Sequence, residues 1–215
     1  MTRLILVRHG QSLANAGELF AGHSDFDLSE FGKSQAKMAA SYLLKTEKID
    51  AIYASDLLRA YHTATPIGEA FGMPVIKDPC FREIFAGEWE SMSFSDIATH
   101  YADAFEVWRS NYSNARPVGG ESTEEVYRRV VPHVKELARK HEGSSILIAA
   151  HATVIRAVEA CARGYSAKET GKVSFCYNAA INIYSYENDK IVPVQSNIIE
   201  HLGDQVTYLP SIINA

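Results

Sequence analysis

Two apolar runs in the sequence end in a histidine, and one of these histidines has unusual neighbours. The run LILV leads into Arg8, His9 and Gly10, and the run ILIAA leads into His151. An imidazole can act as a nucleophile or base, and a guanidinium can hold an oxyanion. Ligands of open parallel sheets bind beyond the carboxyl ends of the strands. We therefore expect His9 and His151 to meet in one site if their strands are neighbours.

Two other kinds of site fit the residues less well. A metal site made of histidines is disfavoured because the cation of Arg8 would oppose a bound metal and no carboxylate is fixed nearby in the sequence. The three cysteines, Cys80, Cys161 and Cys176, show no metal-type spacing, and none stands beside a glycine-rich turn or an obvious base. We interpret them as reduced thiols of a cytoplasmic protein.

Apolar runs alternate with segments of helical spacing along the chain. Expected strands are 3–7, 50–55, 73–77, 144–151 and a hairpin over 179–196, and expected helices are 28–45, 56–72, 93–110, 119–143 and 152–164. This alternation predicts an α/β fold with three layers, in which helices cover both faces of a mostly parallel sheet. We expect a single domain over 1–215, with an irregular aromatic-rich insertion or lid at about 80–120.

Composition narrows the classes of partner. The 215 residues are 47% hydrophobic, which suffices for one well-packed core. The formal net charge is -5, and no basic run is present, so nucleic acid is not expected as a partner. No stretch reaches the roughly 20 apolar residues that span a bilayer, and the first residues do not resemble a signal peptide. We expect a cytoplasmic protein without a membrane partner.

Several sequence blocks resemble one known family. RHG at 8–10 resembles the signature of the histidine phosphatase superfamily, which includes the phosphoglycerate mutases. Further blocks follow in the family's order, namely GHSDFDLSEFGKSQA (22–36), YASDLLRAYHTA (53–64), FREIFAGEWESM (81–92), GGES (119–122), IAAHATVIRA (148–157) and NIIEHL (197–202). The resemblance covers nearly the whole chain and implies the phosphoglycerate mutase-like fold.

The resemblance also implies roles for particular residues. It implies that His9 is the nucleophile and becomes a phosphohistidine. It implies that Arg8, Arg59 and His151 bind the phosphoryl group, and that Glu83 is the proton donor.

More residues are expected at the rim of this site. By resemblance, Ser12 and Asn15 add hydrogen bonds at the pocket edge, and Ala152 stands beside the phosphate where glycine is common in the family. Glu88 and Glu90 are alternatives for the acid. We expect most aromatic residues of 85–112 to pack in the core, with one or two members, such as Phe85 or Trp89, lining the pocket.

These residue types fit phosphoryl transfer. Two guanidiniums can stabilise the charge on the equatorial oxygens, so no metal ion and no cofactor is expected. His9 must be neutral to attack, and the charges of Arg8 and Arg59 should lower its pKa. Gly10 is expected to let the backbone pass close to the phosphate. A backbone carbonyl should hold the other ring nitrogen of His9.

A phosphatase and a mutase of this family would share all of these residues, so only the residues of the pocket wall can distinguish the two enzyme types. The stretch from Trp108 to GGES is only about ten residues long, and it resembles the phosphatase branch, such as the broad-specificity and alpha-ribazole phosphatases. We therefore predict a metal-independent phosphomonoesterase acting on a small phosphorylated substrate. A cofactor-dependent mutase is the alternative, and a non-catalytic phosphate-binding protein is a third. By resemblance, the protein is expected to form a homodimer.

Overall fold

The computed structural model describes residues 1–208, and its centre is one six-stranded sheet with the order β3-β2-β4-β1-β5-β6. The strands are β1 (Thr2–Arg8), β2 (Ala51–Ala54), β3 (Val75–Lys77), β4 (Ser145–Ala150), β5 (Ile181–Glu187) and β6 (Lys190–Ile198). The first four pair in parallel, whereas β5 pairs antiparallel with both β1 and β6. The prediction of a mostly parallel sheet is confirmed.

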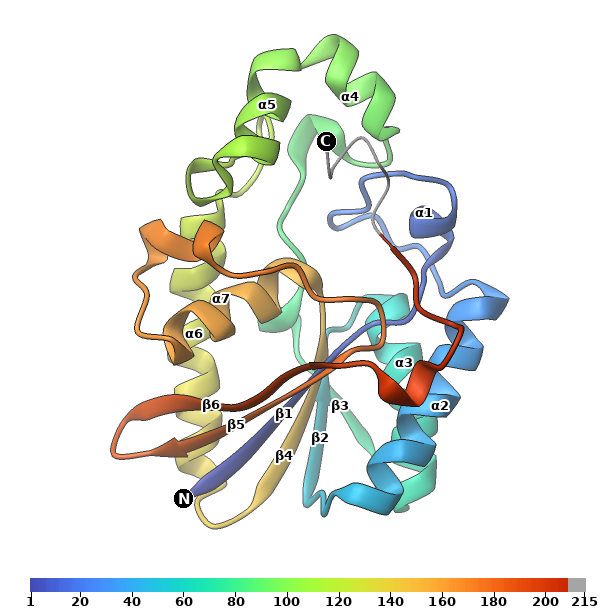
Figure 1. Cartoon of the computed structure of the whole chain (residues 1–215), viewed down its shortest axis with the longest axis vertical. Helices are drawn as coiled ribbons and strands as arrows, with labels where there is room; N and C mark the ends of the chain where they lie inside the picture. Colours follow the sequence, from blue (N-terminus) through green and yellow to red (C-terminus); the bar gives the residue numbers. More distant parts are fainter. Residues whose placement is uncertain (209–215) are drawn as a thin grey trace.

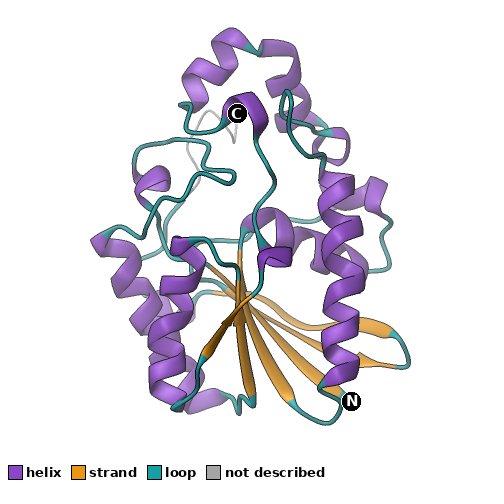
Figure 2. Cartoon of the chain, turned by 180° about the vertical axis from the view of Figure 1, so that it is seen from behind, coloured by secondary structure: helices purple, strands orange, loops and turns teal. Residues whose placement is uncertain are grey.

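Helices cover both faces of this sheet (Figures 1 and 2). The helices are α1 (Leu13–Ala16), α2 (Glu30–Thr46), α3 (Leu58–Phe71), α4 (Phe94–His100), α5 (Ala102–Ser110), α6 (Thr123–Lys140) and α7 (Ala152–Ala162). Short 3₁₀ turns occupy Pro79–Phe81, Gly87–Trp89, Tyr112–Asn114, Ala167–Lys172 and Glu200–Leu202. None of the helices in residues 1–208 is long and apolar enough to cross a membrane.

The alternation of side chains along β1 creates two cores, one on each face. Ile5 and Val7 pack in the cluster that includes Leu43 of α2 and Ile67 of α3. Leu4 and Leu6, which point to the other face, pack in the cluster that includes valines of α6 and α7. The three-layer arrangement predicted from the sequence is therefore confirmed.

Local signals set several helix ends. Ser29 accepts a hydrogen bond from the backbone of Gly32 and so caps α2. Ser122 and Glu125 form a capping box at the start of α6. At least one helix was expected around 93–110, and this stretch contains two, α4 and α5, which meet at Tyr101.

The segment between β3 and α6 lies over one end of the sheet. Figure 1 shows α4 and α5 at the top of the molecule, far from the N-terminus at the bottom. β1 rises from that terminus, so α4 and α5 face the carboxyl ends of the parallel strands. The expected aromatic insertion therefore stands on the side where the two histidines end their strands.

Candidate active site

The pairing of β1 with β4 brings the two histidines together. Arg8 lies opposite Ala150, so the next residue of each strand is a histidine at the same level. The backbone N–H of His9 donates to the carbonyl of Ala150 at 2.9 Å. The rings of His9 and His151 lie 5.2 Å apart between centroids, and both side chains are buried.

Two buried guanidiniums complete this group, and both are held by backbone carbonyls. Arg59, from the first turn of α3, donates to the carbonyls of Gly22 at 2.7 Å and Ser24 at 3.0 Å. Arg8 donates to the carbonyl of Cys176. The Nε atoms of both arginines are buried without a hydrogen-bond partner within residues 1–208. Carbonyls fix these cations without neutralising them, which leaves their charge for an oxyanion.

The surroundings of His9 keep its imidazole neutral. Its Nδ1 lies 2.7 Å from the carbonyl oxygen of Gly10, so Nδ1 carries the proton and donates it. Nε2 then keeps its lone pair. Burial lowers the pKa of His9 well below its usual range, and the charges of Arg59 and Arg8 lower the pKa further. The backbone carbonyl expected from the sequence is that of the next residue.

His151 is neutral for the same reasons. Burial and then the charge of Arg59 lower the pKa of His151 well below its usual range. Its Nε2 lies 2.9 Å from the hydroxyl of Ser55, at the end of β2. Its Nδ1 is buried without a partner in the described part of the chain. With Nδ1 protonated, the ring offers one donor to an oxyanion and its other nitrogen accepts from Ser55.

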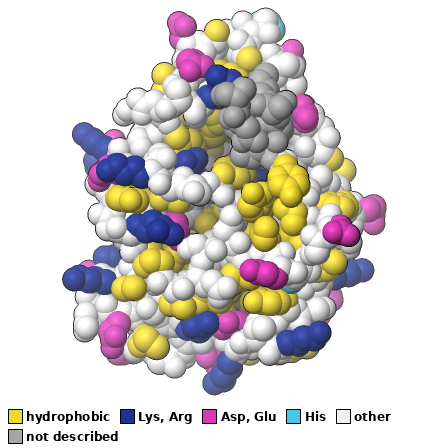
Figure 3. Space-filling model, viewed as in Figure 1, with side chains coloured by type: hydrophobic (Ala, Val, Ile, Leu, Met, Phe, Trp, Pro, Cys, Tyr) yellow, Lys and Arg dark blue, Asp and Glu magenta, His cyan; other side chains and the backbone are white. Residues whose placement is uncertain are grey.

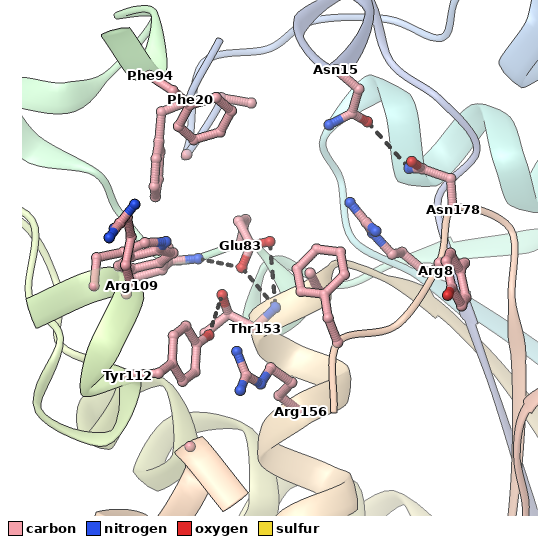
Figure 4. A pocket seen from close by; sticks show the side chains of 18 of the residues that line it. Arg8, Asn15, Phe20, Glu83, Phe94, Arg109, Tyr112, Thr153, Arg156 and Asn178 are labelled. Carbon is pink, nitrogen blue, oxygen red and sulfur yellow. Dashed lines mark hydrogen bonds between the residues drawn. The ribbon is translucent and has the colours of Figure 1, made fainter. Parts of the chain in front are cut away.

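Glu83 lies where α7 begins. The backbone N–H of Thr153 donates to its two carboxylate oxygens at 3.3 and 3.5 Å, and the N–H of Ile84 donates at 2.9 Å (Figure 4). The alternative acids have other tasks. Glu90 accepts from the backbone N–H groups of His23 and Ser24 and so holds the 22–24 loop.

The remaining alternative acid lies outside the cavity. Glu88 accepts from the hydroxyl of Tyr101 and does not line the cavity that contains His9 and Glu83.

The rim residues are divided between the cavity and the scaffold. Asn15 and Ala152 line the cavity, as expected. Ser12 does not: it is fully buried, and its hydroxyl accepts from the N–H of Asn15 as the cap of α1. The side-chain oxygen Oδ1 of Asn15 in turn accepts from the N–H of Ser12 and from the side-chain amide of Asn178. Ser12 therefore positions Asn15 and does not itself reach the cavity, where a hydrogen bond from its hydroxyl was expected.

Gly10 has a structural task that the sequence did not predict. A Cβ at this position would lie 2.5 Å from the carbonyl oxygen of Gly32 in α2. The missing side chain therefore permits a close approach of two backbone segments of the protein.

The cavity around these groups has a volume of about 570 Å³. Its far wall is aromatic and includes Phe94, Trp108 and Tyr112 from the segment over the sheet. The expectation for Phe85 and Trp89 was wrong: neither lines the cavity, since Phe85 is an exposed side chain and Trp89 is fully buried in the core. Both lie in or beside the turn Gly87–Trp89, which directs them away from the cavity.

Sequence reasoning missed several residues of this wall. Arg156 lines the cavity from α7, and Phe175 and Asn178 line it from the segment before β5. Arg156 had a signal, because residues three apart on a helix share a face and α7 follows His151 directly. The space-filling view in Figure 3 shows Lys and Arg side chains within a hollow on the face of the molecule that is drawn there.

Comparison with known proteins agrees with this geometry. Residues 4–199 match the family model described as histidine phosphatase superfamily (branch 1). The chain belongs to this superfamily. It is 34% identical to phosphoserine phosphatase 1 of Hydrogenobacter thermophilus over 204 residues, which are 95% of this chain and 96% of that protein.

Solved structures of the superfamily share the fold. A mycobacterial glucosyl-3-phosphoglycerate phosphatase in complex with VO3 superposes with a TM-score of 0.83 at 31% identity, covering 91% of this chain and 98% of that one. The alpha-ribazole phosphatase of Shigella flexneri superposes with a TM-score of 0.80 at 26% identity, covering 91% and 96%. This histidine phosphatase is therefore an enzyme of the phosphomonoesterase type, as predicted.

Proposed function

We propose that this histidine phosphatase hydrolyses a phosphate ester of a small metabolite through a phosphohistidine at His9. One observation carries the proposal. Nδ1 of His9 is tied to the carbonyl of Gly10, and the ring is buried and neutral between two cations. A neutral imidazole with one free nitrogen beside two guanidiniums is the arrangement that nucleophilic attack on a phosphate ester requires.

In the first step, Nε2 of His9 attacks phosphorus in line with the ester bond. The N–P bond forms while the bond from phosphorus to the leaving oxygen breaks. Arg8 and Arg59 stabilise the charge on the equatorial oxygens, and Nδ1–H of His151 adds a donor. Glu83, protonated at this stage, gives its proton to the leaving oxygen, which departs as an alcohol.

In the second step, water attacks the phosphohistidine. The Glu83 carboxylate takes a proton from the water, an O–P bond forms, and the electron pair of the N–P bond returns to Nε2. Inorganic phosphate leaves, and Glu83 is protonated again for the next cycle. Because guanidiniums supply the positive charge throughout, no step calls for a metal ion.

Phosphate release from p-nitrophenyl phosphate in the presence of a chelator tests the proposal. We expect release to continue with the chelator, and mixtures stopped with alkaline detergent to contain protein-bound phosphate that is stable to alkali and labile to acid. His9→Ala should lose both the phosphate release and the protein-bound phosphate, while its circular dichroism spectrum stays unchanged. His100→Ala, at an exposed histidine of α4, is the matched control. Activity retained in His9→Ala contradicts the proposal, as does stimulation by 2,3-bisphosphoglycerate with interconversion of monophosphates.

A further inference from the structure

The position of Glu83 defines where the organic part of a substrate must lie. An acid that protonates the leaving oxygen must stand on the leaving-group side of the phosphorus, opposite the attacking nitrogen. Glu83 is bound to the first turn of α7 through the N–H of Thr153, and the hydroxyl of Tyr112 donates to the Thr153 hydroxyl at 3.0 Å. The leaving group therefore departs toward the wall that α7 and Tyr112 form (Figure 4).

Arg156 is the cation built into this wall. It lies one turn after Thr153 on α7, and its Cζ stands 3.7 Å from the centre of the Tyr112 ring. Its Nη2 donates to the carbonyl of Val173 at 2.7 Å. Its Nε is buried and has no hydrogen-bond partner within residues 1–208. The ring and the carbonyl hold the guanidinium plane in one orientation beside Tyr112 and Thr153 (Figure 4).

The other cations on this side of the cavity are paired or exposed. Lys172 forms an ion pair with Glu169 at 2.6 Å, and Arg109 forms one with Glu106 at 3.3 Å. Lys168 is exposed to solvent. Arg156 forms no ion pair with any carboxylate in the described part of the chain. Among these cations, Arg156 therefore carries the partly buried charge that a substrate can neutralise.

We propose that Arg156 binds a carboxylate on the leaving group, so that the substrate is a phosphomonoester of a hydroxy or amino acid. This inference rests on the proposed function, since it uses Glu83 to locate the leaving group. A guanidinium placed over an aromatic ring keeps N–H groups free to donate, and its fork of donors matches the planar geometry and single charge of a carboxylate. A cavity of about 570 Å³ holds such a molecule together with its phosphate.

Two pairs of substrates isolate the carboxylate. 3-Phosphoglycerate differs from glycerol 3-phosphate by one carboxylate in place of a hydroxymethyl group, and O-phosphoserine differs from O-phosphoethanolamine by one carboxylate. We expect kcat/KM of the wild-type enzyme to be about 10- to 100-fold higher for the carboxylate member of at least one pair, the range that a charged hydrogen bond supplies. A kcat/KM ratio near one in both pairs overturns the inference. A preference for a bisphosphate over the matching monophosphate that exceeds the preference within the two pairs also overturns it.

A variant assigns the preference to Arg156. Arg156→Gln should reduce the ratio within the preferred pair to about one, chiefly through KM of the carboxylate member. Arg128→Gln, which removes an exposed arginine of α6 outside the cavity, should keep the wild-type ratio. A wild-type ratio retained in Arg156→Gln overturns the assignment, and the wild-type pairs test the inference even if this variant does not fold.

Failure of the inference can be distinguished from failure of the proposed function. An enzyme that releases phosphate from p-nitrophenyl phosphate but shows no preference within either pair keeps the proposed function and loses the carboxylate site. An enzyme that releases no phosphate from p-nitrophenyl phosphate or from any of the four metabolites loses both.

Discussion

Four basic side chains are buried against one another at the centre of the site. Two of them, Arg8 and Arg59, are held by carbonyl oxygens and have Nε atoms without a partner in residues 1–208. Burial lowers the pKa of Arg59 to about 10, still far above neutral pH. The two imidazoles are the groups that give up their charge. In the proposed mechanism, arginine therefore binds the phosphate in a fixed charge state, and histidine supplies a lone pair.

The first prediction concerns the protonation of these imidazoles. The pKa values of His9 and His151 are both lowered, so the neutral forms persist at pH 6.5 and for some distance below. Nitrogen-15 NMR of the ligand-free protein should show both rings neutral at pH 6.5, whereas in urea all histidines should titrate around 6.5. In this interval the unfolded chain binds more protons than the folded one, so stability should fall as the pH drops below 6.5. Either ring found protonated at pH 6.5 contradicts the account.

The second prediction concerns the acid. Replacing Glu83 by Gln removes the proton that an alkoxide needs on leaving, whereas p-nitrophenolate leaves without one. Rapid-quench measurement of enzyme phosphorylation should show a loss of about 10²–10⁴-fold with an alkyl phosphate and a much smaller loss with p-nitrophenyl phosphate. Glu88→Gln, at a carboxylate outside the cavity, is the control. Equal losses for both leaving groups would assign Glu83 a role other than proton donation.

At the scale of elements, the site depends on how closely the loop after β1 approaches α2. A Cβ on Gly10 would meet the carbonyl oxygen of Gly32, and a Cβ on Gly32 would collide with the backbone of Gln11. The two glycines interlock, and this contact fixes the loop that begins at His9. At this contact, the absence of side chains at Gly10 and Gly32 fixes the loop more than side-chain packing does.

The third prediction follows from this contact. Gly32→Ala should destabilise the fold by about 1–3 kcal/mol, the usual cost of forcing extra atoms into a packed region, and should lower kcat by moving His9. Urea unfolding and kinetics on p-nitrophenyl phosphate measure the two effects. At Gly17, a Cβ would be 3.4 Å or more from its neighbours, so Gly17→Ala should be nearly neutral. Similar stabilities for the two variants would show that the loop can move aside.

Elements with a regular hydrophobic period were predictable from the sequence, and the segment over the sheet was not. The strand ending at His151 and the helix capped by Ser122 follow from local pattern alone. In the aromatic segment, Phe85 and Phe94 look alike in sequence, yet Phe85 is exposed and Phe94 lines the cavity. The turn at Gly87–Trp89 decides between them, and its direction depends on contacts with residues 118–120, distant in sequence.

The candidate site was predictable to a similar degree. The residues that end strands, His9 and His151, are brought together by parallel pairing, which the apolar runs indicate. Ser12 could not be assigned from the sequence, because a serine beside a phosphate site and a serine capping the next helix have the same context. Arg156 is similarly ambiguous until its stacking on Tyr112 is known.

At the scale of the whole molecule, the charge of the protein and the charge of its cavity have opposite signs. The net charge is -5, whereas six cations and two carboxylates line the cavity, namely Arg8, Arg59, Arg109, Arg156, Lys168, Lys172, Glu83 and Glu169. Anions are therefore drawn to one place on a molecule that repels them elsewhere. We therefore expect small anionic substrates and not extended ones such as nucleic acids.

The fourth prediction is that an oxyanion stabilises the whole fold. Arg8 and Arg59 are buried without ion-pair partners in residues 1–208, so folding brings two like charges out of water without full compensation. Phosphate or vanadate at 100 times its dissociation constant should add about 2.7 kcal/mol, and therefore roughly 5–10 °C in Tm for a chain of this size. Sodium chloride of equal ionic strength is the control for screening. Arg59→Gln should lose most of the increment because one of the two guanidiniums is gone. If phosphate raises Tm no more than chloride does, the buried arginines are compensated within the protein and the oxyanion site is not formed in the free enzyme.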